Sequence, residues 1–154
     1  MKNLEEWFFE YGKSHQNEVN IKIHKVCVPV IMLSILGLIS LIETPSLFVD
    51  LKINYAHLIS VLALIFYATL SFPLSALMMV LLIFMLETIN YAKIHFTFND
   101  TLILWVALFL LGWVGQFIGH KIEGKKPSFL QDIVFLLIGP LWVIAPVLPK
   151  YRKK

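Results

Sequence analysis

Residues 53–86 read INYAHLISVLALIFYATLSFPLSALMMVLLIFML and contain no formally charged side chain. One continuous α-helix over this stretch would be about 50 Å long at about 1.5 Å per residue, whereas the hydrocarbon core of a bilayer is about 30 Å thick. Ser71-Phe72-Pro73 interrupts the stretch with residues that favour a turn. We therefore predict a helical hairpin, with membrane spans at 55–70 and 74–91.

The whole chain has the composition of a membrane protein. Of its 154 residues, 58% are hydrophobic and 15% are charged, and the mean hydropathy is +0.78. A soluble domain of this size would expose too much of that apolar surface to water. Further apolar stretches predict spans at 21–42 and 101–120. We expect one all-α domain over residues 1–154, an integral membrane helical bundle with four transmembrane helices.

Two shorter segments flank the predicted spans. Residues 3–13 carry one apolar stripe at helical spacing, which predicts an N-terminal amphipathic helix at the membrane interface. Asn3 and Glu6 have the spacing of a capping box for that helix. Residues 133–149 are apolar but contain three prolines, so we expect a re-entrant or interfacial segment there rather than a fifth span.

The distribution of Lys and Arg predicts the topology. Four lie in residues 1–25, three in 121–126 and four in 150–154, whereas the connections 44–54 and 92–100 hold one each. The positive-inside rule then places both termini in the cytoplasm, in a bacterial inner membrane or in the endoplasmic reticulum of a eukaryote. Since the net charge is only +3 and the lysines flank apolar runs, nucleic acid is not an expected partner.

This topology sorts the five histidines. His15, His24 and His120 fall at the cytoplasmic face, whereas His57 and His95 fall at the opposite face, about 30 Å away. His15 and His24 would lie on opposite faces of one unbroken helix, so both can reach one site only if the chain turns between them. Residues 14–20, SHQNEVN, are typical of such a turn.

Converging histidines in an apolar bundle indicate a metal site, because imidazole is a good ligand for iron, zinc or copper. The ring nitrogen that does not bind metal needs an orienting partner, for which the sequence offers Asn17, Asn20, Gln116 and Glu123. Glu123 is alternatively a direct ligand. Lys121, Lys125 and Lys126 are candidates for holding a substrate carboxylate, although their role as ordinary topology signals is the favoured explanation. A stripe of small residues allows span 101–120 to pack closely on span 21–42, through Gly112, Gly115 and Gly119.

Two sequence blocks are distinctive: YGKSHQNEVNIKIHKVCVP at 11–29 and GWVGQFIGHKIEGKKPSFLQDIVFLLIGPLW at 112–142. In order and spacing they resemble the Mpo1-like family, formerly a domain of unknown function. The resemblance implies a membrane-embedded, iron(II)-dependent dioxygenase that shortens 2-hydroxy fatty acids by one carbon using O₂. It also implies roles for individual residues: His15, His24 and His120 as metal ligands, Asn17 and Asn20 as cofactor-binding amides, and Gln116 and Glu123 as catalytic side chains. Residue 18 is Glu where many relatives have Pro.

Three functions remain open on the residues alone. An iron oxygenase would draw its apolar substrate sideways from membrane lipid, and O₂ chemistry needs a redox metal with open coordination positions. A zinc-dependent lipid hydrolase would use the same histidines, with Glu123 as general base. A non-catalytic membrane scaffold or transporter subunit would hold no tightly bound metal.

Overall fold

The computed structural model describes residues 2–46, 53–127 and 134–151, and in these ranges it contains helices and no strand. This agrees with the predicted all-α class. The helices are α1 (Leu4–Gly12), α2 (Glu18–Ser40), α4 (Tyr55–Leu70), α5 (Phe72–His95), α6 (Phe98–Glu123) and α7 (Phe135–Ile144), followed by two short 3₁₀ turns at Ala145–Val147 and Pro149–Tyr151.

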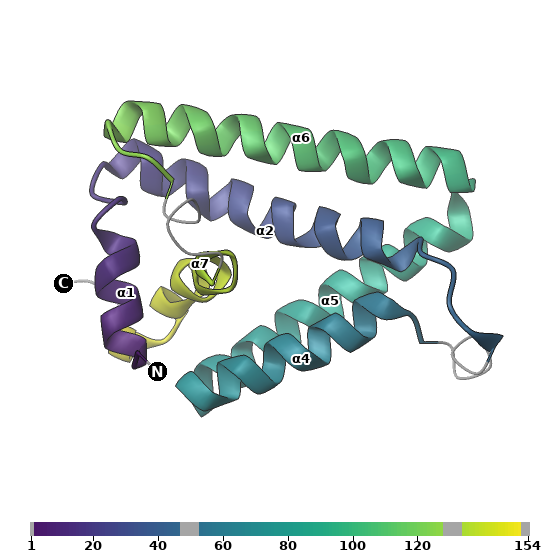
Figure 1. Ribbon diagram of the computed structural model, residues 1–154, viewed down its shortest axis with the longest axis horizontal. Helices are drawn as coiled ribbons and strands as arrows, with labels where there is room; N and C mark the ends of the chain where they lie inside the picture. The colour runs from purple at the N-terminus through teal and green to yellow at the C-terminus, as the bar shows by residue number, and fades with distance from the viewer. Residues whose placement is uncertain (1, 47–52, 128–133, 152–154) are drawn as a thin grey trace.

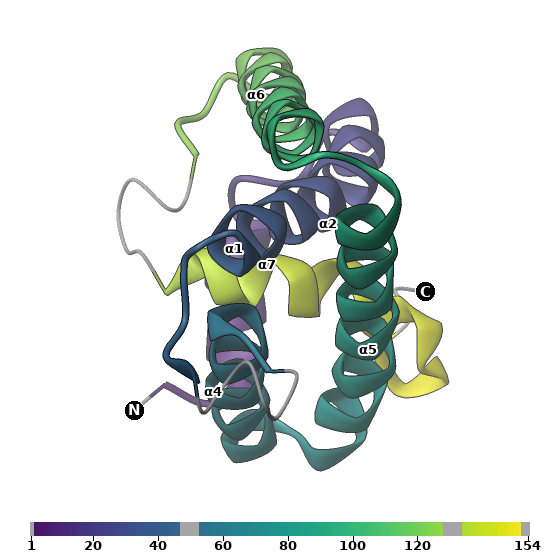
Figure 2. The same ribbon diagram turned by 90° about the vertical axis from the view of Figure 1, so that its right-hand side faces the viewer.

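Helices α2 and α6 lie side by side over most of their lengths (Figures 1 and 2). The predicted stripe of small residues is the reason. A Cβ atom at Gly112, Gly115 or Gly119 would collide with Ile31, Cys27 or Asn20 of α2, respectively. The close approach brings the start of α2 against the end of α6, although these segments are about 100 residues apart in the chain.

Helices α4 and α5 form the predicted hairpin, and the chain reverses at Ser71, which ends α4 and precedes α5. A proline in the first turn of α5 is compatible with helix geometry, because that turn needs no N–H donor. The hairpin is inclined to α2 and α6 in Figure 1. Leu36, near the C-terminal end of α2, packs into one apolar cluster with Leu82 of α5 and Ala56 of α4. The α2–α6 pair and the α4–α5 hairpin therefore meet near that end of α2.

Helices α1 and α7 cross the end of the bundle at which α2 begins (Figures 1 and 2). The capping box is present: the Glu6 amide donates to Asn3 Oδ1 at 2.9 Å, and the Asn3 amide donates to Glu6 Oε2 at 2.8 Å. Trp7 packs edge-to-face on Phe135 of α7, with ring centroids 5.3 Å apart. The apolar stripe of α1 is therefore largely buried against protein, and its position at the membrane interface stays a prediction.

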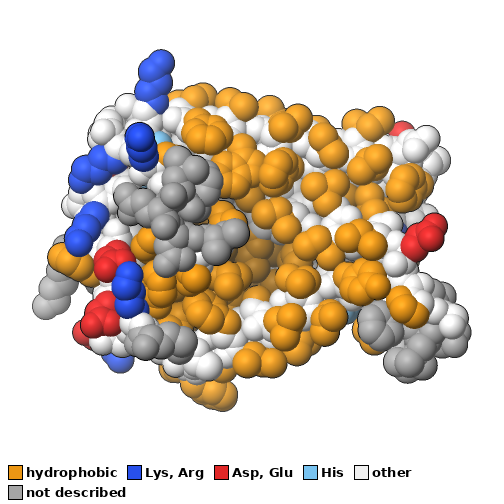
Figure 3. All heavy atoms as spheres, viewed as in Figure 1, with side chains coloured by type: hydrophobic (Ala, Val, Ile, Leu, Met, Phe, Trp, Pro, Cys, Tyr) orange, Lys and Arg blue, Asp and Glu red, His pale blue; other side chains and the backbone are white. Residues whose placement is uncertain are grey.

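Within the described ranges, three helices are long and apolar enough to cross a membrane: α2, α5 and α6. Helix α4 has 16 residues and α7 has 10, both shorter than the roughly 20 residues of an ordinary span. The four-span arrangement therefore stays a prediction. On the face drawn in Figure 3, the Lys and Arg side chains gather at the end where α2 begins, and hydrophobic side chains cover the middle.

Several predicted boundaries were wrong by a few residues. Helix α2 begins at Glu18 instead of residue 21, since Asn17 caps it by accepting hydrogen bonds from the amides of Val19 and Asn20. The turn after α1 is correspondingly shorter than 14–20. The predicted connection 92–100 shrinks because α5 continues to His95, and Thr97 already caps α6 by accepting a hydrogen bond from the Asp100 amide at 3.2 Å.

Candidate metal centre

His15 enters the end of the bundle at which α2 begins, from the short turn between α1 and α2. Its Nδ1 lies 2.6 Å from the backbone carbonyl oxygen of Tyr11, and its ring stacks on the Tyr11 ring with centroids 4.1 Å apart. The imidazole is fully buried. The turn thus holds this side chain in place through one hydrogen bond and one stacked ring.

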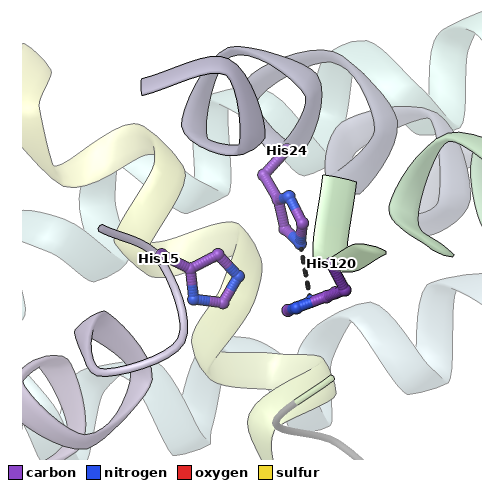
Figure 4. A group of neighbouring side chains, drawn as sticks. All are labelled: His15, His24 and His120. Carbon is purple, nitrogen blue, oxygen red and sulfur yellow. Dashed lines mark hydrogen bonds between the residues drawn. The ribbon is translucent and has the colours of Figure 1, made fainter. Parts of the chain in front are cut away.

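His24 and His120 project toward His15 from α2 and α6 (Figure 4). The two side chains are 1% and 4% exposed. His24 Nδ1 lies 3.0 Å from the backbone carbonyl oxygen of Asn20, and its Nε2 lies 3.1 Å from Nε2 of His120. One potential ligand nitrogen from each of the three histidines fits within a group whose atoms all lie within 4.8 Å of one another.

The hydrogen bonds fix which nitrogens are available to a metal. A carbonyl oxygen can only accept, so Nδ1 of His15 and of His24 carries the hydrogen and Nε2 carries the lone pair. His15 Nε2 and His120 Nδ1 are buried without a hydrogen-bond partner. Unpartnered buried polar atoms each cost about 1–3 kcal/mol, and a metal ion bound by the lone pairs would remove part of that cost. The residues therefore fit a bound metal.

Burial also keeps the His15 ring in the protonation state that coordinates metals. Desolvation, partly opposed by the hydrogen bond to the Tyr11 carbonyl, lowers the pKa of His15 to about 3. The neutral ring then predominates at physiological pH, so metal binding does not have to displace a proton from it.

Glu123 lies beside the three histidines, but its carboxylate is bound to the turn between α1 and α2. It accepts hydrogen bonds from the Gln16 amide at 2.8 Å, the Asn17 amide at 2.9 Å and Asn20 Nδ2 at 3.0 Å. Two residues further on, Lys125 Nζ donates to the Lys13 carbonyl oxygen at 2.6 Å. The end of α6 thus fastens the turn that carries His15. Glu123 does not belong to the group of close metal-ligand atoms.

The predicted amides occupy three different positions. Asn17 is exposed and its side chain caps α2. Asn20 is fully buried: its Nδ2 donates to Glu123 and to the Ser14 carbonyl oxygen, while its Oδ1 has no hydrogen-bond partner. Gln116 is buried one turn before His120 and lines a cavity with His24 and His120. Asn20 and Gln116 are therefore near the imidazoles, and the Asn17 side chain is engaged in capping.

The other two histidines lie outside the group. His57 Nδ1 accepts a hydrogen bond from the Asn54 amide at 3.2 Å, as part of the cap at the start of α4. His95 is exposed at the end of α5, with its ring 4.2 Å from the ring of Tyr91. The structure thus separates these two from the other three, as the topology argument predicted.

A cavity of about 370 Å³ opens from the three histidines. Apart from the histidine end, its walls are mostly aliphatic and aromatic side chains from α2, α4, α5, α6 and α7. Along α2 the lining runs from His24 to Leu36, which is about 18 Å of helix. Figure 3 shows a recess in the middle of the apolar face, and Ile59 and Leu136 are lining residues that are also exposed. The cavity is therefore long, apolar and open to the side.

The predicted lysine contacts do not extend into this cavity. Among the described residues, no lysine lines it; Lys121 and Lys126 are exposed, and Lys125 bonds to the Lys13 carbonyl. A carboxylate at the inner end of the cavity would therefore meet imidazole and amide groups rather than an ammonium group.

Comparison with known protein families agrees with the resemblance seen in residues 11–29 and 112–142. A family model described as "2-hydroxy-palmitic acid dioxygenase Mpo1-like" matches residues 1–151. The chain belongs to the Mpo1-like family. It is also similar to the 2-hydroxy-palmitic acid dioxygenase MPO1 of Saccharomyces cerevisiae, with 29% identity over 136 residues, covering 87% of this chain and 73% of the yeast protein. No solved structure matches the chain.

The structure of this Mpo1-like chain adds residues that the sequence reasoning missed. Tyr11 supplies both the carbonyl that orients His15 and the ring that stacks on it, and Trp142 of α7 packs near the same imidazole with centroids 5.5 Å apart. A backbone acceptor leaves no side-chain pattern to detect. The spacing of Tyr11 and His15, four residues apart, was the one available signal for their contact.

Proposed function

We propose that this protein is an iron(II)-dependent dioxygenase that converts a 2-hydroxy fatty acid into the fatty acid one carbon shorter. One observation carries the proposal: three buried imidazoles, two of which use Nδ1 for a backbone hydrogen bond and so carry their lone pair on Nε2, stand at the end of a long apolar cavity. Membership of the Mpo1-like family and the name of the yeast relative support the substrate class.

His15, His24 and His120 would hold the metal. Three protein ligands leave coordination positions open, and bound iron(II) would supply the redox chemistry that O₂ requires. Iron is favoured over zinc on this ground, since zinc has no redox chemistry. The stacked Tyr11 ring and the Tyr11 and Asn20 carbonyls hold two of the imidazoles in fixed orientations, which limits the reorganisation needed when a metal binds.

The overall reaction balances without a further reductant. A 2-hydroxy acid R–CHOH–COOH and O₂ give R–COOH, CO₂ and H₂O: the bond between C1 and C2 breaks and C2 becomes the new carboxyl carbon. The substrate loses four electrons, and O₂ accepts the same four. The apolar cavity would bind the alkyl group R and exclude water from it, and Gln116 at the inner end would orient the polar head beside His24 and His120.

The alternatives find less support. A zinc hydrolase would need Glu123 as general base, but both oxygens of that carboxylate accept hydrogen bonds from the turn that carries His15. A scaffold would have no use for three clustered imidazoles in an apolar interior, two of them with a nitrogen that has no hydrogen-bond partner.

Metal analysis and a turnover assay on the same sample test the proposal. Protein purified without oxygen should contain one redox-active iron per chain, and with iron(II) and 2-hydroxypalmitate it should consume O₂ and release the acid one carbon shorter. Palmitate, which lacks the 2-hydroxyl group, is the matched control and should give neither product nor O₂ uptake. Zinc in place of iron, together with cleavage of an ester or amide without O₂ uptake, would establish the hydrolase instead.

A further inference from the structure

We infer that the end of the cavity remote from the histidines sets the maximum chain length of the substrate, an inference that rests on the proposed function. The cavity has two chemically different ends. His15, His24, His120 and Gln116 form the polar end, and Leu36, Ser60 and Leu82 form the remote end. A 2-hydroxy acid has the same polarity, with its reacting head at one end and its alkyl terminus at the other.

Toward the α4–α5 hairpin the remote end is closed by side-chain packing, whereas the side of the cavity is open at Ile59 and Leu136. Leu36, Ser60 and Leu82 are 4%, 3% and 2% exposed, respectively. Behind them lies an apolar cluster that includes Ala56 and Trp105, and the Trp105 indole fills the space beside Gly37 so closely that a Cβ on that glycine would collide with it. An alkyl chain that enters with its head at the histidines therefore meets a wall where α2 meets the α4–α5 hairpin.

The hydroxyl groups of Ser60 and Tyr67, which line the cavity, both bond within the protein. Ser60 Oγ donates to the Ala56 carbonyl oxygen at 2.7 Å, and Tyr67 Oη donates to the Leu137 carbonyl oxygen at 3.1 Å. The walls then offer an alkyl chain only apolar contact. Each methylene that fits should raise affinity about fourfold, and the first methylene that reaches the wall should stop this increase.

Residues of α4 line the cavity at different distances from the remote end, so substituting them should shift the length limit by different amounts. Ser60 lies at the remote end and Ala63 lies one turn nearer to Tyr67 and α7. Ser60→Leu should lower the maximum length, Ala63→Leu should lower it further, and Leu36→Ala should raise it. Ala68→Leu and Leu62→Ala change exposed positions of α4 that do not line the cavity, so they are matched controls for the filling and the emptying substitutions.

Displacement of cis-parinaric acid by 2-hydroxy acids of increasing length, measured on Zn(II)-loaded protein, gives a readout that is independent of turnover. We expect affinity to rise with chain length up to one length, the break, and to stop rising beyond it, with the break at the same length in the wild type and both controls. Each cavity variant should move the break as stated, with about a fourfold loss of affinity for every methylene that no longer fits. The same break should appear in kcat/KM when iron-loaded protein oxidises the series.

Because Ala63→Leu should lower the maximum chain length and Leu36→Ala should raise it, the inference stays testable if one of these variants folds poorly. An unbroken profile in the wild type, or a break that stays in place in both Ala63→Leu and Leu36→Ala, would overturn it. If the break moves as expected but no 2-hydroxy acid is oxidised by any iron-loaded form, the length limit stands and the proposed reaction is wrong.

Discussion

At the scale of single residues, the three buried histidines differ from the other two in what holds their rings. His15 and His24 each donate Nδ1–H to a backbone carbonyl oxygen within the preceding turn, and His24 faces His120 at 3.1 Å. We predict that His15→Ala, His24→Ala and His120→Ala each deplete bound metal and abolish activity while the protein still inserts. Metal content by mass spectrometry of purified protein is the measurement.

The two remaining histidines provide controls of the same residue type. His57→Ala and His95→Ala alter a helix cap and an exposed helix end, and both variants should keep their metal and stay near wild-type activity. Full metal occupancy in His120→Ala, or an inactive His57→Ala at normal expression, would show that the histidines are grouped wrongly.

Substitutions of Glu123 can show whether this residue coordinates metal directly or positions the turn that carries His15. Its carboxylate binds the Gln16 and Asn17 amides and the Asn20 side chain, so Glu123→Gln should weaken metal binding about 10- to 100-fold, as expected for a partner that orients a ligand-bearing segment. Glu123→Asp should recover part of the loss because a charged acceptor remains. Competition with a chelator measures both affinities. Complete loss of metal in Glu123→Gln, equal to that in His15→Ala, would favour direct coordination.

At the scale of helices, the packing of α6 on α2 determines whether two of the histidines meet. A Cβ at Gly119 would collide with Asn20 Oδ1 and lie 3.4 Å from His24 Cε1. We predict that Gly119→Ala lowers metal affinity at least tenfold and stability by about 1–3 kcal/mol, since the helices must move apart. Gly12→Ala, where a Cβ meets nothing within 4 Å, should leave both unchanged. Chelator competition and thermal melting in detergent report the two quantities separately.

The helices themselves were largely predictable from sequence because apolar runs, a proline in a turn and capping residues are local signals. The hairpin around Ser71 and the approach of α2 to α6 through glycines followed from such signals. The inclination of the hairpin to α2 did not, because crossing angles depend on how side chains from both elements interlock. The cavity between α2 and α4 is a product of that inclination, so its position could not be read from the chain.

The candidate site, like the fold, had features that local sequence signals predicted and others that they did not. Its three histidines stood out because imidazoles are rare and costly in an apolar bundle, whereas the acceptors for two of them are main-chain carbonyls of Tyr11 and Asn20. Glu123 was recognised as important, but its actual partners are mostly backbone amides of a turn. Contacts of that kind depend on the path of the backbone and are independent of side-chain identity.

At the scale of the whole molecule, the Lys and Arg side chains in Figure 3 gather at the end where α2 begins, and His24 near the start of α2 and His120 near the end of α6 lie at that same end. The positive-inside rule assigns this end to the cytoplasm. In a Cys27→Ser background, a cysteine at Tyr151 or Lys2 should react with a membrane-impermeant maleimide only after the cytoplasmic face is opened. A cysteine at Glu43, at the far end of α2, should react from the outside. Labelling of Tyr151→Cys from the outer face would replace the four-span arrangement by one with a fifth crossing.

The length of chain between His24 and His120 has a consequence for biosynthesis. When α1 and α2 have left the ribosome, the turn with His15 exists, but the residue that fastens it, Glu123, and the third imidazole have not been synthesised. Because chains grow at about 5–20 residues per second, several seconds separate the first two ligands from the last. The group of three histidines can thus be completed only after the α4–α5 hairpin has been synthesised, so we expect any metal to be loaded late in biosynthesis.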